Sequence, residues 1–247
     1  VRLFDSEGKK LRLTRAGVLL QNAATTVRHD DMILMEQMKP DREISLSFGA
    51  TLTIGDFVLP ERLAAFLKRE PEAKIKMLVD NTQALLKKIN AGELDFAVIE
   101  GYFRKSEYEH QVWSRQHYIA VCGACYSFRK RVRSLSDLFG ERILLREQGS
   151  GTREIFERYM AERNGSVLDF ESRMEIGSIS AIKSLAAAGC GITFLYEAAV
   201  KSELECGSLR RIPLSDFEIY NDFTMVWRKG SIFNDRYLHL FDGLLSE

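Results

Sequence analysis

Residues 73–99, AKIKMLVDNTQALLKKINAGELDFAVI, contain a strand–helix–strand unit that decides the fold class. Apolar residues open and close this stretch, and Thr82 and Gly92 mark the start and end of the helical pattern between them. Two strands joined by a helical crossover lie parallel in one sheet. With the residues just upstream, the predicted order is βαβαβ, with elements at 44–49, 55–70, 73–79, 82–90 and 94–99.

The same order of elements returns in the second half of the chain, although the two halves are not similar in sequence. The predicted elements of this second unit are strands at 143–145, 170–176 and 191–195 and helices at 153–164 and 180–188. Alternating strands and helices are typical of the α/β class with parallel sheets. Two such units predict two lobes with a ligand cleft between them.

Two further strand-like segments, 117–122 and 223–228, are predicted to cross between the lobes. A final helix at 234–245 is then expected to return to the first lobe. The predicted limits are 44–119 and 220–247 for lobe I and 120–219 for lobe II.

The N-terminal residues do not fit the two-lobe pattern. Residues 1–13 read as a short basic hairpin, and the chain opens on Val1 inside it, so we expect a further module upstream. Lys9, Lys10 and Arg12 are candidates for contacts to DNA phosphate, although a solvated hairpin explains the same charges equally well.

A long helix is predicted over 14–39, with Thr14 as its cap. Small and apolar residues share one stripe at spacings of three, four or seven: Ala16, Leu20, Ala23, Val27, Leu34 and Met38. Asp30 and Asp31 interrupt this stripe. The pattern favours pairing with the same helix of a second chain through Leu20, Val27 and Leu34, and the alternative is a helix lying on its own domain.

Charge and apolar patterning exclude several classes of protein. Lys plus Arg and Asp plus Glu both number 35, so the chain as a whole shows no basic bias toward nucleic acid. No apolar run is long enough for a membrane span and no secretory leader opens the sequence, which predicts a cytoplasmic protein without a membrane partner.

Signatures of enzymes and of bound cofactors are weak. The four cysteines and four histidines show no metal-ligand spacing. The phosphate loop and the dinucleotide-binding glycine pattern are both missing, and 148–151 lacks the first glycine of a nucleophile elbow. We therefore expect no catalytic residue, metal or cofactor. The pair Cys122 and Cys125 is read as ordinary packing, with a redox switch as the less favoured hypothesis.

Hydroxyl and amide residues follow four predicted strands, where helices begin. These junctions are 50–53, 81–83, 149–153 and 177–180. Ligands of parallel α/β units bind at this edge of the sheet, and helix N-termini favour anions. Each junction alone is explained by helix capping, whereas four that converge on one cleft favour a binding site. Glu100, at the end of the third strand, either points away or pairs with a cationic part of the ligand.

Five stretches, in this order, resemble the LysR-type bacterial transcriptional regulators. They are VRLF at 1–4 with LTRAG at 13–17, LPERLAAF at 59–66 with Pro71, GELDFAV at 92–98, GSGTR at 149–153, and SAI at 180–182 with AAGCGI at 187–192. The resemblance implies a winged helix-turn-helix upstream, of which 1–13 is the remnant of the wing. It also implies a dimerising linker helix and a type 2 periplasmic-binding-protein-like effector domain.

By the same resemblance, effector contacts are expected at the ends of the strands and the starts of the helices. The candidate residues are Thr51, Thr53, Thr82, Glu100, Gly101, Ser150, Thr152 and Ser178. The predicted function is effector sensing and oligomerisation in such a regulator. We expect a small anionic metabolite, with a carboxylate as the favoured class, to bind between the lobes and to alter the packing of a homodimer or homotetramer. DNA would be contacted only through the missing N-terminal domain.

Two other functions compete with this interpretation. A solute-binding receptor would have the same lobes, but that interpretation predicts a signal peptide, a monomer and no paired N-terminal helix. A hydrolase or transferase on this scaffold is the weakest alternative, because no nucleophile–base pair can be identified.

Overall fold

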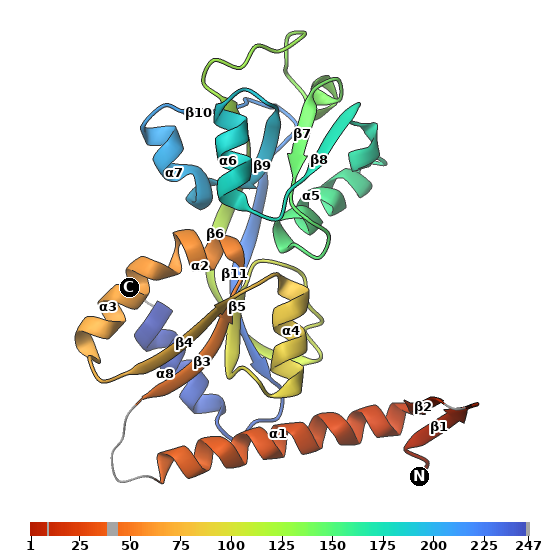
Figure 1. Cartoon of the computed structure of the whole chain (residues 1–247), viewed down its shortest axis with the longest axis vertical. Helices are drawn as coiled ribbons and strands as arrows, with labels where there is room; N and C mark the ends of the chain where they lie inside the picture. Colours follow the sequence, from red (N-terminus) through yellow and green to blue (C-terminus); the bar gives the residue numbers. More distant parts are fainter. Residues whose placement is uncertain (9, 39–43, 246–247) are drawn as a thin grey trace.

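The computed structural model describes residues 1–8, 10–38 and 44–245. It contains two lobes stacked end to end, with a long helix across the far end of the first lobe (Figure 1). The predicted fold class is confirmed, because strands and helices alternate in each lobe and two long strands run between the lobes.

Lobe I consists of three parallel strands with helices on either side (Figure 1). Its elements are β3 (Ser45–Ala50), α2 (Leu52–Phe57), α3 (Leu59–Arg69), β4 (Lys74–Val79), α4 (Thr82–Ala91), β5 (Phe96–Ile99) and α8 (Asn234–Leu245). The C-terminal helix α8 packs beside α3, so it returns to lobe I as the sequence predicts.

Lobe II repeats the parallel arrangement with β7 between β8 and β9. Its elements are a 3₁₀ turn (Leu135–Leu138), β7 (Arg142–Leu145), α5 (Gly151–Ala161), a second 3₁₀ turn (Val167–Asp169), β8 (Ser172–Glu175), α6 (Ile179–Ala187), β9 (Ile192–Tyr196), α7 (Glu197–Glu205) and β10 (Leu209–Arg211). Neither α7 nor β10 is predicted by the sequence analysis.

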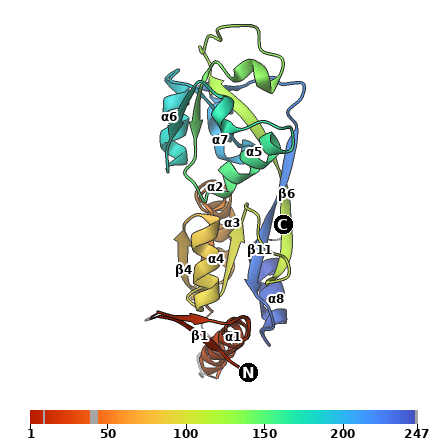
Figure 2. The ribbon, with the colours of Figure 1, turned by 90° about the vertical axis from the view of Figure 1, so that its right-hand side faces the viewer.

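The crossing strands β6 (Tyr108–Gly123) and β11 (Ile219–Arg228) join both lobes into one sheet. Its nine strands run β4-β3-β5-β11-β6-β9-β7-β8, with β10 beside β6, and β11 is antiparallel to both β5 and β6. Figure 2 shows both crossing strands along one side of the molecule. The prediction of a short strand at 117–122 was wrong in length, since β6 has 16 residues and pairs with β11 in lobe I and β9 in lobe II.

The helix predicted at 55–70 is two helices, α2 and α3, which meet at Val58. Pro60 explains the break, because its ring nitrogen carries no hydrogen to bond the preceding turn of a continuous helix. α2 starts earlier than predicted, at Leu52, so Thr51, directly after β3, is its N-cap residue and Thr53 lies in its first turn. α2 lies at the end of lobe I that faces lobe II (Figure 1).

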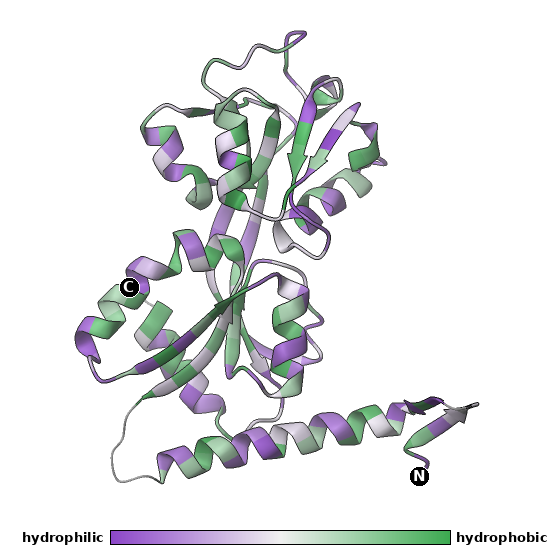
Figure 3. Ribbon diagram, in the orientation of Figure 1, coloured by the Kyte–Doolittle hydropathy of each residue, from purple (hydrophilic) through white to green (hydrophobic). Residues whose placement is uncertain are grey.

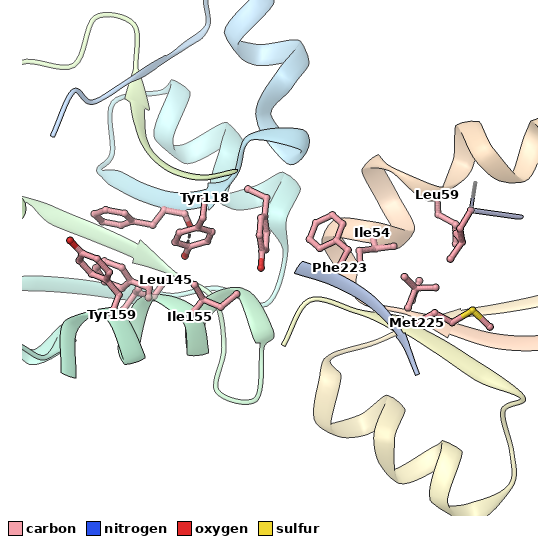
Figure 4. Close-up of a cluster of buried hydrophobic side chains, with 14 of the residues drawn as sticks. Ile54, Leu59, Tyr118, Leu145, Ile155, Tyr159, Phe223 and Met225 are labelled. Carbon is pink, nitrogen blue, oxygen red and sulfur yellow. Dashed lines mark hydrogen bonds between the residues drawn. The ribbon is translucent and has the colours of Figure 1, made fainter. Parts of the chain in front are cut away.

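Apolar side chains from the strands form the core on both sides of the boundary between the lobes. Figure 4 shows Ile54, Leu59, Phe223 and Met225 in lobe I and, across the gap, Tyr118, Leu145, Ile155 and Tyr159. Each fully buried side chain of this size stabilises the fold by about 1.5–3 kcal/mol. In Figure 3 most of the central strands are coloured as hydrophobic, whereas the outer helices carry both hydrophobic and hydrophilic residues.

The N-terminal hairpin consists of β1 (Phe4–Glu7) and β2 (Lys10–Leu13), and α1 (Arg15–Gln37) follows it. Thr14 caps α1 by accepting a hydrogen bond from the Gly17 amide at 3.0 Å. Gly17 must be glycine, since a Cβ atom there would lie 2.1 Å from the Leu3 carbonyl oxygen. The prediction of a hairpin and a capped helix is confirmed for the described residues.

One face of α1 packs on lobe I, and this is not the face that the apolar stripe predicted. Thr26, His29, Asp30 and Ile33 are buried there. The Asp30 carboxylate accepts hydrogen bonds from the Ser231 hydroxyl at 2.6 Å and the Ile232 amide at 3.0 Å. Asp30, which interrupts the stripe in the sequence, therefore anchors the helix to its own domain.

A different face of α1 carries the residues proposed for pairing. Leu20, Val27 and Leu34 are 53%, 69% and 41% exposed. Large apolar side chains exposed in a row are the usual mark of an interaction surface. One face of α1 therefore lies on its own domain, as the alternative interpretation expected. Pairing through the exposed apolar stripe stays a prediction.

Candidate ligand-binding site

The lobes meet where β5 ends and α5 begins. Glu100, the first residue after β5, is only 1% exposed and points across the boundary. The Thr152 hydroxyl, in the first turn of α5, donates a hydrogen bond to Glu100 Oε1. One side-chain hydrogen bond thus joins lobe I directly to lobe II.

Buried hydroxyl groups from both lobes surround this hydrogen bond. Thr51, Thr53, Thr82 and Ser150 are each at most 2% exposed. Their hydroxyl oxygens, and Glu100 Oε2, have no hydrogen-bond partner among the described residues. Leaving a buried polar group unpaired costs about 1–3 kcal/mol, so a cluster of them points to a site for a polar ligand.

Arg146 supplies the positive charge of the cluster. It is the first residue after β7, as Glu100 is the first after β5, and it is 3% exposed. Its Nε and Nη2 atoms each donate to Glu147 at 2.8 Å, whereas Nη1 is buried without a partner in the described part of the chain. The guanidinium therefore keeps one donor available.

Burial raises the pKa of the Glu100 carboxyl above its ordinary value. The hydrogen bond from Thr152, the nearby hydroxyls of Thr53 and Thr51, and the charge of Arg146 oppose this shift without cancelling it. Thr51 and Thr53 lie close enough to favour the charged form, yet outside good hydrogen-bond geometry. Glu100 thus holds its proton to a higher pH than a solvated glutamate.

Two buried tyrosines fix the backbone around the cluster. The Tyr118 hydroxyl lies 2.9 Å from both the Thr152 and Phe194 carbonyl oxygens. The Tyr196 hydroxyl is 3.4 Å from the Glu100 carbonyl oxygen, which also accepts a hydrogen bond from Asn221 Nδ2 at 2.7 Å. Burial, and then the charge of Glu100, raise the pKa of both tyrosines well above the ordinary value, so both remain neutral donors.

Contacts on both sides of the cluster hold the lobes in a closed arrangement. A Cβ atom on Gly151 would lie 2.8 Å from the Gly101 Cα atom, so the backbones of the two lobes meet at a pair of glycines. Lys183 Nζ lies 4.3 Å from the centre of the Phe57 ring, and the Arg158 guanidinium lies 4.3 Å from that of Tyr102. Each of these contacts joins one lobe to the other.

A cavity of about 340 Å³ opens at the edge of the cleft, between α4 and α5. Its lining residues are Gln83, Gln148, Gly149, Ser150, Arg153, Glu154 and Glu157. Ser150 lines this cavity and also belongs to the buried cluster, so the cavity borders the cluster. A larger cavity of about 610 Å³ lies elsewhere, against α3 and α8 in lobe I.

The structure brings together seven of the eight residues expected to bind a ligand. Ser178 is exposed, and its hydroxyl accepts a hydrogen bond from the Ala181 amide at 3.3 Å, so it acts as the cap of α6. Arg146 was missed by the sequence analysis. Its place directly after a buried strand is the signal that could have revealed it.

The LysR substrate binding domain family matches residues 41–245 of this sequence. The chain belongs to the LysR-type transcriptional regulators. The HTH-type transcriptional regulator YeiE of Escherichia coli (strain K12) is 27% identical over 212 residues, which cover 86% of this chain and 71% of YeiE. The comparisons therefore support the regulator interpretation over the solute-binding receptor.

Two solved structures share the fold of the regulator. The CcmR regulatory domain of Synechocystis PCC6803, in complex with 2-PG, has a TM-score of 0.71 at 20% identity and covers 83% of this chain and 99% of its own. The effector-binding domain of QuiR, in complex with shikimate, has a TM-score of 0.69 at 15% identity and covers 82% and 96%. Structures of this fold thus hold small molecules.

The remaining candidate residues of the regulator lie away from the cleft. Lys10 and Arg12 are exposed on the hairpin, and Lys9 lies outside the described residues. Cys122 is buried, and burial raises the pKa of its thiol to about 11 against the charge of Arg210, whereas Cys125 is exposed. A thiol with this pKa is protonated at neutral pH and is a poor nucleophile.

The described residues offer neither a metal site nor a membrane-spanning helix. Residues 1–8, 10–38 and 44–245 contain no group of three or more histidine, cysteine, aspartate or glutamate side chains placed to hold a metal ion. In the same part of the chain, every helix is too short or too polar to cross a bilayer.

Proposed function

We propose that this chain is the effector-sensing and oligomerising part of a cytoplasmic LysR-type regulator and has no enzymatic activity. A small anionic metabolite such as a carboxylate binds the hydroxyl cluster between the lobes. The observation that carries this proposal is the set of unpaired buried hydroxyls contributed by both lobes around Glu100 and Thr152. The ligands of CcmR and QuiR support a small molecule in this fold.

The proposed domain limits follow the sequence analysis. Residues 1–13 are the remnant of a wing, 14–39 the dimerisation helix, 44–119 and 220–247 lobe I, and 120–219 lobe II. In the whole regulator, a helix-turn-helix domain would contact DNA, and a homodimer or homotetramer would be held through Leu20, Val27 and Leu34. Their exposure on α1 supports this surface.

The proposed mechanism is a change in the arrangement of the lobes. A ligand that binds one arrangement better than another shifts the population toward it, whereas equal affinity shifts nothing. Because α1 is anchored to lobe I through Asp30, a change in the lobes can reach the dimer surface.

The test is a thermal-shift screen of small carboxylates and amino acids, followed by titration calorimetry with the best compound. The double variant Thr51→Val and Thr53→Val removes two hydroxyls at nearly constant volume. It should weaken binding about tenfold or more, as expected for lost hydrogen bonds to a charged ligand. Thr25→Val, on α1, is the matched control and should bind like the wild type. Unchanged affinity in the double variant would place the ligand elsewhere.

A further inference from the structure

Glu100 carries a carboxyl group into the place where an anionic effector would bind. Thr152 already donates to it, and the unpaired hydroxyl of Ser150, 2% exposed, lies at the N-terminus of the same helix. The free N–H groups at the start of α5, which has 11 residues, favour negative charge. The Glu100 carboxyl group therefore occupies a site at the N-terminus of α5 that favours an anion.

In the described part of the chain, no cationic side chain is hydrogen-bonded to the Glu100 carboxyl group. The charge of Arg146, at the end of β7, favours ionised Glu100, but two nitrogens of Arg146 already hold both carboxylate oxygens of Glu147. The other titratable groups packed against Glu100 are Tyr118 from β6 and Tyr196 from β9, and both are neutral. An anion entering beside ionised Glu100 would bring a further negative charge into a buried site whose cation, Arg146, is already bound to Glu147, and this is unfavourable.

We propose that Glu100 is a proton-coupled gate: an anionic effector occupies the hydroxyl cluster only when Glu100 is protonated, and each bound anion brings one proton from solvent. The proton goes to a carboxyl oxygen of Glu100, and no covalent bond to the effector forms. The Thr152 hydroxyl can still donate to the other oxygen, so closure of the lobes survives protonation. This inference rests on the proposed binding of a ligand in the cleft.

The experiment is isothermal titration of the protein with sulfate, acetate and malonate between pH 5.5 and 8.5. Each titration is repeated in two buffers of different ionisation enthalpy, which yields the number of protons taken up. In the wild type, affinity should fall about tenfold per pH unit above the pKa of Glu100, and uptake should approach one proton per bound anion. Sulfate keeps its charge over this range, so its pH dependence reports the protein alone.

Two variants assign the proton. Glu100→Gln should bind the anions at pH 8.5 at least as tightly as the wild type does at pH 5.5, with no proton uptake. Asp56→Asn is the matched control, because partial desolvation also raises the pKa of the Asp56 carboxyl, against the charge of Arg146, although the residue is exposed to solvent at the surface. It should keep the pH dependence of the wild type.

Four results would overturn the gate. Anion binding without proton uptake in the wild type is decisive and needs no variant to fold. Loss of binding in Glu100→Gln would mean that the carboxylate pairs with a cationic group of the effector. Lack of binding by all three anions to wild type and Glu100→Gln would exclude an anion site. If Thr51→Val with Thr53→Val weakens binding while Glu100→Gln leaves the pH profile unchanged, the cleft site stands and only the gate is wrong.

Discussion

Asn221 and Arg228 lie at opposite ends of β11 and contact the two regions that a signal must connect. Asn221 Nδ2 donates to the Glu100 carbonyl oxygen at 2.7 Å, beside the hydroxyl cluster. Arg228 Nε donates to the Thr26 hydroxyl at 3.3 Å, and Nη2 lies 3.4 Å from the Asn22 carbonyl oxygen, both on α1. At about 3.3 Å per residue, the strand spans roughly 23 Å between them. β11 thus links the cleft directly to α1.

Arg228→Gln should loosen α1 from lobe I. Arg228 is 5% exposed, and its lost hydrogen bonds should lower the free energy of unfolding by about 2 kcal/mol. Hydrogen exchange of the amides in 22–33 should become faster, while affinity for a cleft ligand should change little. Arg104→Gln, whose side chain is 82% exposed, is the control. Unchanged exchange along α1 would contradict the anchoring role.

A charge on the exposed stripe of α1 should separate the protomers. Val27→Glu together with Leu34→Glu places two carboxylates on a surface proposed to pair with its own copy, where burying them unpaired is costly. Sedimentation at micromolar concentration should show the wild type as a dimer or larger and the variant as a monomer with an unchanged circular dichroism spectrum. Leu168→Glu, at a lobe II residue that is 71% exposed, should leave the mass unaltered. A monomeric wild type would remove this interface.

Gly151→Ala should force the lobes apart. The added Cβ would lie 2.8 Å from both the Gly101 Cα and N atoms, and these backbone atoms cannot rotate away. Overpacking of this kind costs about 1–3 kcal/mol, and opening the cleft relieves it. Small-angle scattering should show a larger radius of gyration. Gly140→Ala, whose Cβ would have only Glu171 Oε1 nearby, at 4.0 Å, should match the wild type. A variant as compact as the wild type would show that the lobes need not touch there.

Glu100→Gln should change how stability depends on pH. Burial raises the pKa of Glu100 in the folded state, so between its ordinary and raised pKa the folded chain holds more protons than the unfolded chain. Stability contributed by this group is therefore complete below the ordinary pKa and is lost as pH rises through the raised one. The melting temperature of Glu100→Gln relative to the wild type should increase with pH and then level off. Glu107→Gln, in an exposed ion pair, should follow the wild-type curve.

The sequence predicted most elements of both lobes because their signals are local. Gly92 and Gly189 close their helices with positive φ of 72° and 77°, and Thr14 caps α1 through its own side chain. Local signals predicted too short a strand for β6, because its partners β9 and β11 lie far along the chain. They also predicted one continuous helix in place of α2 and α3, because both helices carry apolar residues at helical spacing.

The order of strands and helices and the hydroxyl residues that follow the strands could be predicted from the sequence alone, since backbone periodicity and turn chemistry act over a few residues. The face of α1 that meets lobe I, the free donor of Arg146 and the burial of Glu100 against Thr152 became evident only in the folded chain. Those outcomes depend on residues some 50 to 200 positions apart in the chain coming into contact, and charge and burial take their energetic value only from that environment.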